Sequence, residues 1–467
     1  MSRADGLPGL QALAAHGASV SARVVDLDDG DTIASIDPSL RLTPASLTKL
    51  VTAAAAFTHW NADTSFTTRL LINGEIDNGR VHGDLILQGG GDSTLDDADL
   101  WSLAAQLRGA GINAVDGSLL VVPAPFGPMA CGTPDRCKAL KRSDTAYNAE
   151  ISSIGIDFGN WCVTVHPTAP GNPARVSACA TARLPIPVNG DIQTVGARGR
   201  QSFWVERRTT ADGDSLQIGG NIPVGQPVNV YRAMSNPARG TGLVLAEILR
   251  EIGVHFSGRV VVTSRVATQH AFGVAEVKSR PLRNQLDSML RYSNNYIADV
   301  TTLDLASDLS RVPPTTLSEA GSALANFVAR SNQQQGQSTS PPPLYSGSGL
   351  TPDNRLSAND LVNLLTTMYH DPRNFPAFYG GLVVPREAPF AFLRSGDNAW
   401  LDRVTLKTGT MNDPRSVFGI AGYARKRKGG WLAFAMIVNG SERVHHIPLY
   451  KALAAARGDL QAILARH

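Results

Sequence analysis

A run dominated by alanine and other apolar residues, positions 50–57, follows a short polar segment that contains Ser46 and Lys49. No Gly or Pro interrupts the run, so the pattern predicts a buried helix over residues 44–57. Ser46 would lie in its first turn and Lys49 three residues later, on the same face. The lysine amine could then reach the serine hydroxyl beside the free N–H groups of the helix N-terminus. The stretch therefore predicts a nucleophile and base pair.

Apolar and alternating segments predict strands at both ends of the chain. Residues 20–27 and 32–36 are joined by turn residues and predict a hairpin that leads into the helix. Two apolar runs, 416–424 and 430–439, predict adjacent strands that close the same sheet. The basic turn between them, Arg425 to Lys428, suits an anionic surface such as a membrane, although solvated turns of this kind are common.

From about Thr67 the pattern changes to short strands and turns, and one arrangement occurs twice. Residues 103–112 and 245–254 each predict an amphipathic helix that stops at glycine and leads into a β-rich strand. Two copies are too few for a solenoid, so we expect two α/β units packed in one domain. The intervening Gly- and Pro-rich segment, 161–235, predicts a small all-β module.

These changes of pattern divide the chain into three predicted domains. A catalytic domain takes residues 1–66 and 272–467, an inserted α/β domain takes 67–160 and 236–271, and a β-rich domain takes 161–235. The length of 467 residues fits this division, because it exceeds that of one ordinary core.

Composition narrows the functional class. The chain has 43 basic and 40 acidic residues, a balance that gives no reason to expect a nucleic-acid partner. No apolar run is long enough to span a bilayer, and the first residues lack the apolar core of a signal peptide. We therefore expect either a cytosolic protein or a mature form written with a new Met1.

Four cysteines fall as two local pairs, Cys131 with Cys137 and Cys162 with Cys179. They form no Cys-x-x-Cys and accompany no His cluster, which argues against a zinc site. Two interpretations stay open: two disulfides formed in an oxidising compartment, or four reduced cysteines in the core.

About one Ser-x-x-Lys is expected by chance in a chain of this length, so Ser46 and Lys49 alone are weak evidence for a catalytic pair. Two downstream motifs strengthen that interpretation. A Ser-x-Asn element begins at Ser293, and Lys-Thr-Gly begins at Lys407 before the C-terminal hairpin. This ordered trio is typical of penicillin-binding proteins and class A β-lactamases. The chemistry requires all three elements to converge on one cleft.

The first two motifs supply groups for acyl transfer. Ser46 would attack a carbonyl, and Lys49 would act as base when its amine is neutral, a state that burial and the second cation Lys407 favour. Ser293 can relay a proton to the leaving amine. Asn295 can hold a substrate peptide group or fix Lys49.

The third motif suits substrate binding. Lys407, Thr408 and Thr410 supply a cation and hydroxyls for a terminal carboxylate. Gly409 lets a substrate approach the strand closely. The backbone N–H groups of Ser46 and Thr410 are the predicted oxyanion hole.

With these residues, the sequence resembles the class C low-molecular-mass penicillin-binding proteins, the D-alanyl-D-alanine carboxypeptidase/endopeptidase family. The resemblance extends over nearly the whole chain and includes residues 83–87, Gly91-Asp92 and the Gly-Ser-Gly-Leu segment at 347–350. The long interval between Lys49 and Ser293 is typical of this class, whereas β-lactamases have a much shorter one.

The resemblance implies an α/β multi-domain fold. Its transpeptidase-like catalytic domain has an antiparallel sheet flanked by helices, and an inserted α/β domain carries a small all-β domain. It implies release of terminal D-Ala from peptidoglycan stem peptides and hydrolysis of D-Ala–diaminopimelate cross-links through an acyl-enzyme on Ser46. It also implies acylation by β-lactam antibiotics without a metal or other cofactor. Together with the disulfide interpretation, it leads us to expect a periplasmic or otherwise extracytoplasmic mature protein.

The resemblance also suggests specificity residues. Met411 and Asp144 resemble a pocket that reads the free amine end of diaminopimelate in some relatives. Ser346 is a departure, because relatives often carry Asp before Gly-Ser-Gly-Leu.

Two other functions stay open as alternatives. A serine β-lactamase or esterase would deacylate quickly, but no Glu-x-x-Asn lies between Ser293 and Lys407. A non-hydrolytic, penicillin-recognising wall-binding protein would keep the site without turnover. The retention of every polar residue of the trio argues against that second alternative.

Overall fold

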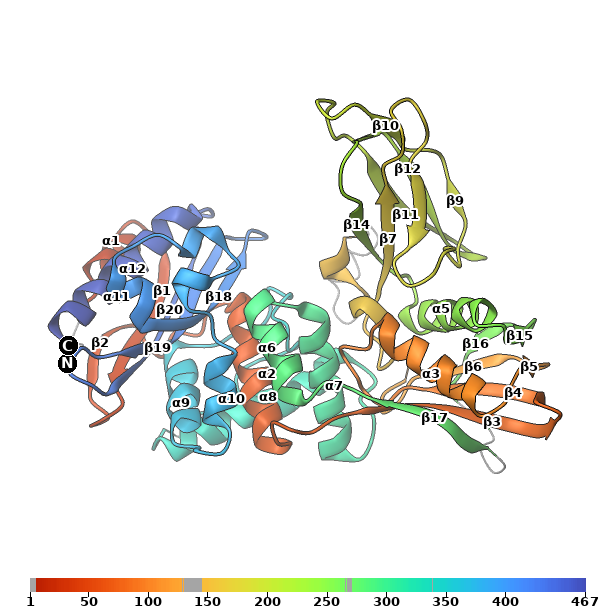
Figure 1. Cartoon of the computed structure of the whole chain (residues 1–467). Helices are drawn as coiled ribbons and strands as arrows, with labels where there is room; N and C mark the ends of the chain where they lie inside the picture. Colours follow the sequence, from red (N-terminus) through yellow and green to blue (C-terminus); the bar gives the residue numbers. More distant parts are fainter. Residues whose placement is uncertain (1–5, 128, 130–144, 265, 267–270, 338) are drawn as a thin grey trace. The chain divides into compact units, whose positions relative to one another are not determined.

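The computed structural model describes residues 6–127, 129, 145–264, 266, 271–337 and 339–467 (Figure 1). The chain forms two compact units. The first unit comprises the chain up to Thr64, Pro281–Ser310 and Thr316–His467, and the second comprises Ser65–Arg280 with Arg311–Thr315. Both termini therefore belong to the first unit.

The first unit is built on a five-stranded antiparallel sheet in the order β18-β19-β20-β1-β2. Its strands are β1 (Ser19–Asp26), β2 (Thr32–Ile36), β18 (Val404–Met411), β19 (Val417–Arg425) and β20 (Trp431–Asn439). Nearly every residue of β19 and β20 is buried, because helices cover both faces of the sheet. Both hairpins predicted from the sequence are confirmed.

The helices of the first unit form two groups (Figure 1). On one face of the sheet α1 (Pro8–Ala15), α11 (Asn398–Arg403) and α12 (Leu449–Arg466) share an apolar core with the strands. On the other lie α2 (Thr48–His59), α6 (Leu282–Tyr292), α7 (Asn295–Ser310), α8 (Leu317–Gln334), α9 (Ala358–Tyr369) and the short α10 (Phe375–Gly380). The first ten residues of α2 are all buried, since the other helices of this group surround it.

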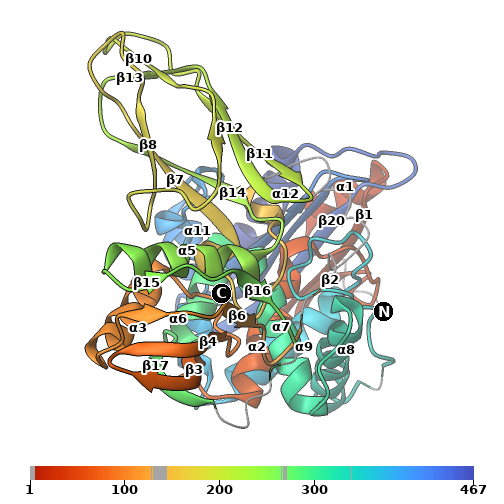
Figure 2. The same ribbon diagram turned by 90° about the vertical axis from the view of Figure 1, so that its right-hand side faces the viewer.

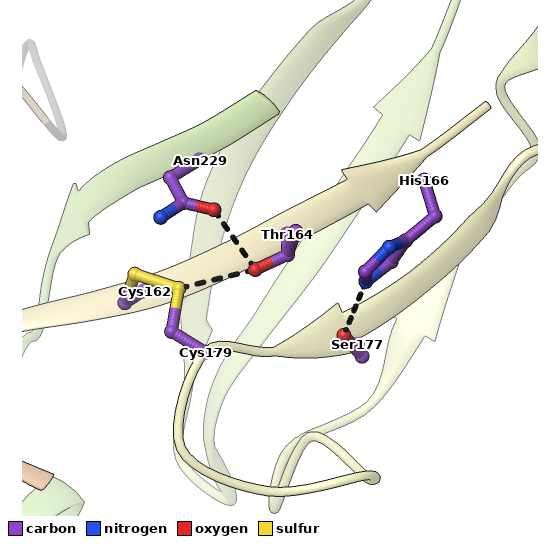
Figure 3. The surroundings of a disulfide bond; sticks show 6 residues. All are labelled: Cys162, Thr164, His166, Ser177, Cys179 and Asn229. Atoms are coloured by element: carbon purple, nitrogen blue, oxygen red, sulfur yellow. Dashed lines mark hydrogen bonds between the residues drawn. A yellow bond between two sulfur atoms is a disulfide. The ribbon is translucent and has the colours of Figure 1, made fainter. Parts of the chain in front are cut away.

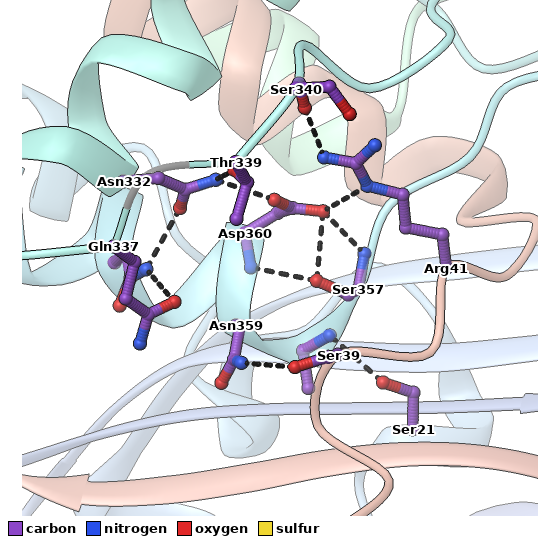
Figure 4. A network of polar contacts seen from close by, with 12 residues as sticks. Ser21, Ser39, Arg41, Asn332, Gln337, Thr339, Ser340, Ser357, Asn359 and Asp360 are labelled. Carbon is purple, nitrogen blue, oxygen red and sulfur yellow. Dashed lines mark hydrogen bonds and ion pairs between the residues drawn. The ribbon is translucent and has the colours of Figure 1, made fainter.

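A polar network fixes the start of α9 (Figure 4). Ser357 and Asp360 form a capping box, which satisfies N–H groups that the first helical turn leaves open. Asp360 also accepts hydrogen bonds from Arg41 Nε at 3.3 Å and from Asn332 Nδ2 at 2.7 Å. The buried carboxylate therefore ties the start of α9 to α8 and to the segment that leads into α2.

The second unit contains a seven-stranded sheet. Its strands are β3 (Thr67–Asp77), β4 (Arg80–Gln88), β5 (Ala114–Val115), β6 (Leu119–Val122), β15 (His255–Phe256), β16 (Val260–Val262) and β17 (Phe272–Lys278), and α3 (Asp97–Gly109) and α5 (Pro237–Glu251) pack against it (Figure 2). The two sequence repeats meet here, because β6 and β16 pair directly in parallel. The two predicted α/β units therefore lie in one compact unit, where they share a sheet.

One predicted boundary is wrong. Residues 272–278, which the sequence pattern assigned to the catalytic domain, form β17 and pair with β3 in the second unit. A strand's partner depends on backbone hydrogen bonds to a remote segment, and the local pattern does not reveal it.

Short strands fill residues 160–233, as predicted for the β-rich segment. They are β7 (Asn160–His166), β8 (Arg175–Ala178), β9 (Val188–Asn189), β10 (Gln193–Val195), β11 (Trp204–Thr210), β12 (Gly213–Gly219), β13 (Asn221–Pro223) and β14 (Val228–Ala233). They form small sheets of two or three strands. This segment groups with the α/β sheet in one unit, so its separation as a third domain stays a prediction.

The predicted bridge between Cys162 and Cys179 is present and joins β7 to the chain just after β8 (Figure 3). Thr164 lies beside it and donates to Asn229 Oδ1 on β14 at 2.9 Å. The predicted Cys131–Cys137 bridge lies outside the described residues. Among the helices described, none combines the length and apolar character needed to cross a membrane.

Candidate active site

The local fold places Ser46 and Lys49 side by side. Ser46 lies in a 3₁₀ turn, η1 (Ala45–Leu47), and Lys49 lies in the first turn of α2. Lys49 Nζ is 3.0 Å from Ser46 Oγ. The lysine is fully buried, whereas the serine is half-buried.

Two further acceptors hold the amine of Lys49. Asn295 Oδ1 on α7 lies 2.8 Å from Nζ, and the backbone oxygen of Ser348 lies 2.7 Å from it. Together with Ser46 Oγ, these two atoms give the amine three oxygen neighbours, as many as an ammonium group has N–H donors. The side chain is thereby fixed in one orientation by segments about 250 and 300 residues away in sequence.

Ser293 and Lys407 form the second pair. Ser293 occupies the junction between α6 and α7 with a left-handed backbone, φ 58°. Lys407 Nζ on β18 donates to Ser293 Oγ at 3.0 Å and to the backbone oxygen of Thr408 at 2.8 Å. Burial disfavours the charged amine and lowers the pKa of Lys407 to about 7. Its charge therefore changes near neutral pH.

Strand β18 is an edge strand, and it packs closely against η1. A Cβ atom at Gly409 would lie 2.4 Å from the backbone oxygen of Pro44, so only glycine allows this approach. The sequence analysis gave Gly409 a different purpose, close approach of substrate, and that role stays a prediction. Thr408 is buried, Thr410 is exposed and Met411 is half-buried.

The outer edge of β18 has a defined hydrogen-bonding pattern. Leu406 exchanges two backbone hydrogen bonds with Val383 on the side away from β19. Because the direction of backbone groups alternates along a strand, Thr408 and Thr410 present their N–H and C=O groups to this same outer side. Thr410 N–H thus points away from the sheet, as an oxyanion-hole donor must.

The loop at residues 346–350 was underestimated by the sequence analysis. Ser348 supplies the carbonyl that holds Lys49, and its N–H donates to the fully buried Asp299 at 2.9 Å. Thr52 Oγ1 donates to the oxygen of Gly347 at 2.9 Å. Gly-Ser-Gly was noted in the sequence, but a backbone carbonyl gives no residue-type signal.

Ser346 fits this loop despite its difference from relatives. Its hydroxyl accepts the N–H of Gly349 at 3.2 Å, and its carbonyl accepts Asn354 Nδ2 at 2.9 Å. Gly349 has φ +72°, and a Cβ atom there would lie 1.9 Å from the oxygen of Ala45. The loop can therefore lie directly on the turn that carries Ser46.

The structure brings together Ser46 with Lys49 and Asn295, and Ser293 with Lys407. Asp144 lies outside the described residues, so the diaminopimelate pocket predicted for it and Met411 stays a prediction. Among the residues described, no group of three or more His, Cys, Asp or Glu side chains is arranged to hold a metal ion.

Comparison with known proteins agrees with the motifs. The model of the D-Ala-D-Ala carboxypeptidase 3 (S13) family matches residues 10–456. The chain belongs to this family. The resemblance to class C penicillin-binding proteins is thereby confirmed, and with it membership of a family of serine D-Ala-D-Ala carboxypeptidases that act on the bacterial cell wall.

Two relatives match over most of their length. The D-alanyl-D-alanine carboxypeptidase DacB of Haemophilus influenzae is 25% identical over 444 residues, covering 91% of this chain and 86% of its own. The D-alanyl-D-alanine carboxypeptidase of Actinomadura sp. (strain R39) is 28% identical over 461 residues, 94% of this chain and 81% of its own.

The fold agrees as well. The crystal structure of penicillin-binding protein 4 (dacB) from Haemophilus influenzae superimposes with a TM-score of 0.76 at 21% sequence identity, covering 97% of this chain and 99% of that one. The predicted fold class, a multi-domain α/β protein with a transpeptidase-like domain, is confirmed.

Proposed function

We propose that this S13 protein is a penicillin-sensitive serine D-Ala-D-Ala carboxypeptidase and endopeptidase that works through an acyl-enzyme on Ser46. The observation that carries the proposal is the contact between Lys49 Nζ and Ser46 Oγ at 3.0 Å, with the amine fixed by two other acceptors. Few other side chains could serve as nucleophile and base in such an arrangement.

Lys49 activates Ser46 in its neutral form. A neutral amine has two N–H donors and one lone pair. When the donors bond to Asn295 Oδ1 and the oxygen of Ser348, the lone pair faces Ser46 Oγ and can accept its proton. Ser46 Oγ then attacks the carbonyl of the penultimate D-Ala and forms the ester bond.

Two backbone N–H groups stabilise the negative oxygen that forms in this attack. The Ser46 N–H belongs to the first turn at the helix start, where N–H groups have no acceptor within the helix. The Thr410 N–H faces the outer edge of β18. Donors fixed in place before the reaction stabilise the tetrahedral intermediate without reorganisation.

Ser293 and Lys407 act on the leaving group. Charged Lys407 binds its carboxylate together with the hydroxyls of Thr408 and Thr410. Ser293 Oγ, 3.0 Å from Lys407 Nζ, relays to the leaving nitrogen the proton that Lys49 took from Ser46, as the C–N bond breaks. Water then gives a proton to Lys49 as it attacks the ester on Ser46, and Lys49 returns that proton to Ser46 Oγ as the shortened peptide leaves.

The substrate class and the inhibitors follow from the same site. The Haemophilus protein has also been solved in complex with a β-lactam, and we infer the same class of covalent inhibitor for this chain. Because peptidoglycan lies outside the cytoplasm, we place the protein in the periplasm or an equivalent compartment. The Cys162–Cys179 disulfide supports that location.

A paired substrate assay tests the proposal. Wild-type protein should release D-Ala from a stem pentapeptide and split a cross-linked dimer into monomers, and Ser46→Ala should do neither. Hydrolysis of both substrates by Ser46→Ala would overturn the assignment of the nucleophile. Rapid hydrolysis of penicillin with both peptides left intact would indicate a β-lactamase instead.

A further inference from the structure

A basic pocket lies next to Ser293 in the first unit. Its volume is about 350 Å³, and its lining includes Arg291, Tyr292, Arg386, Glu387 and Arg394. Arg291 and Tyr292 are the last two residues of α6 and directly precede Ser293. One wall of the pocket is therefore formed by the end of the helix that leads directly to Ser293.

The opposite wall also starts beside the site. Val383 pairs with Leu406, the residue before Lys407, and the chain then enters the 3₁₀ turn η4 (Pro385–Glu387). The pocket is thus bounded by the two segments that flank the Ser293–Lys407 pair, and not by the residues that surround Ser46.

The three arginines differ in how their charges are balanced. Arg386 is bound by both carboxylate oxygens of Asp402, which fixes its position and offsets its charge. Arg291 lies 3.6 Å from Asp287 Oδ1, at the long end of an ion pair. Both of these charges are therefore at least partly compensated.

Arg394 is different. Its Nε donates to the oxygen of Ala388 at 2.7 Å and its Nη2 to the oxygen of Pro389 at 3.3 Å. Backbone carbonyls orient a guanidinium but do not neutralise it. Over the described part of the chain, no carboxylate oxygen lies within 4.0 Å of Arg394, whose side chain is exposed. The pocket thus has a fixed, uncompensated guanidinium, the group best suited to a carboxylate.

Under the proposed function, the pocket lies on the leaving-group side of the active site. Ser293 protonates the leaving nitrogen and Lys407 binds the leaving carboxylate, so the leaving group lies on their side of the scissile bond. In a carboxypeptidase reaction the leaving group is a single D-Ala and ends there. In a cross-link it is a diaminopimelate residue whose second half, with the rest of a second stem peptide, continues further.

We propose that this pocket is a leaving-group subsite that binds a free carboxylate of the second stem peptide of a cross-link, chiefly through Arg394 with Arg291 beside it. Exposed Tyr292 offers an aromatic surface for the peptide, and Glu387 on the rim suits a free amine. The subsite rests on the proposed function. It raises kcat/KM for cross-linked peptides and is not needed for hydrolysis of the monomeric pentapeptide.

The test compares two substrates in three proteins: wild type, Arg394→Ala and the double variant Arg291→Ala/Arg394→Ala. The specificity constant kcat/KM for a cross-linked muropeptide dimer should fall about tenfold in Arg394→Ala and further in the double variant. The values for pentapeptide hydrolysis and for acylation by penicillin should change less than about twofold. Unchanged acylation also shows that the variants are folded.

Arg330→Ala removes an exposed arginine elsewhere on the first unit and is the matched control. Equal losses on both substrates, or no loss on the dimer, would overturn the subsite alone. A wild-type protein that hydrolyses the pentapeptide but not the dimer would overturn both the subsite and the endopeptidase assignment. Failure on both peptides would contradict the proposed function itself.

Discussion

Each unit of the molecule withdraws charged groups from water, and the two do so differently. In the first unit Lys49 and Lys407 are almost completely buried, and each is held by acceptors on other segments. In the second unit Asp92 is buried and Asp157 is half-buried, and both lie near other carboxylates. Burial raises the pKa of Asp92 to about 6, and burial together with Asp97 raises that of Asp157 to about 7.

The buried groups of the two units have different roles: those of the first unit contribute to reactivity and those of the second to stability. The lysines are joined by hydrogen bonds to segments that are remote in sequence, which positions their nitrogens beside two serine hydroxyls. Asp92 instead accepts from the N–H and hydroxyl of Thr94, two residues away, and so stabilises a local turn. We therefore expect changes at the lysines to alter reactivity, and changes in the second unit to alter stability.

The largest effect should come from removing the base. Lys49→Ala should lower the rate of acylation by penicillin about 10²–10⁴-fold, because no other amine lies at hydrogen-bonding distance from Ser46 Oγ in the described structure. The rate is measured with a fluorescent penicillin. Asp92→Asn, a buried change in the second unit, is the matched control and should acylate at the wild-type rate. Equal acylation rates in Lys49→Ala and the wild type would contradict the assignment of reactivity to the first unit.

Loss of the disulfide should lower stability without lowering the acylation rate. The bridge closes a loop with a sequence separation of 17, so the double variant Cys162→Ser/Cys179→Ser should destabilise the second unit by about 3 kcal/mol. Peptide-resolved hydrogen exchange should show faster exchange in β7, β8 and β14 but not in α2 or β18. If the acylation rate of the double variant fell by as large a factor as its hydrogen exchange rose, this would contradict the assignment of stability to the second unit and reactivity to the first.

The charge of Lys407 should control recognition of a terminal carboxylate. The folded protein keeps this amine charged only below about pH 7, so kcat/KM for a peptide with a free carboxylate should fall as pH rises through 7. Above pH 7 this kcat/KM should fall by up to about tenfold per pH unit. A peptide with an amidated C-terminus is the control, and the ratio of the two constants cancels any titration of Lys49. A ratio that stays constant from pH 6 to 9 would contradict this role.

The last effect concerns Asp157 and the dependence of stability on pH. Its raised pKa means that the folded state keeps a proton that the unfolded state has released, so the free energy of unfolding falls as pH rises from about 4 to about 7. Asp157→Asn should flatten this dependence and stabilise the protein at pH 8, and asparagine tolerates the left-handed backbone at this position, φ 50°. Urea unfolding at pH 5 and pH 8 measures it. Asp191→Asn at an exposed position should leave the pH dependence unchanged.

The predictability of the two units also differs. The helix that carries Lys49 and the C-terminal hairpin follow from local patterns, and three spaced motifs were enough to predict which side chains meet. The carbonyl of Ser348 and the carboxylate of Asp299 were missed, because their roles depend on a loop that only the folded chain places beside α2. β17 was assigned to the wrong unit because its partner β3 lies about 200 residues earlier.

At two predicted site residues the structure adds a contact that the sequence pattern did not specify. Gly409 was expected to make room for a substrate, yet its lack of a side chain already lets β18 contact the oxygen of Pro44. Asn295 was given two alternative roles, and the structure supports the one in which it fixes Lys49. Sequence spacing indicates which residues meet, but distances are needed to decide what each contact does.

The most direct test of the account is covalent labelling followed over time. The protein is incubated with penicillin, digested and analysed by mass spectrometry, with Ser46→Ala as the control. We predict a stable penicilloyl adduct on Ser46 and none in the variant. An adduct on any other residue, or no adduct in the wild-type protein, would contradict the account.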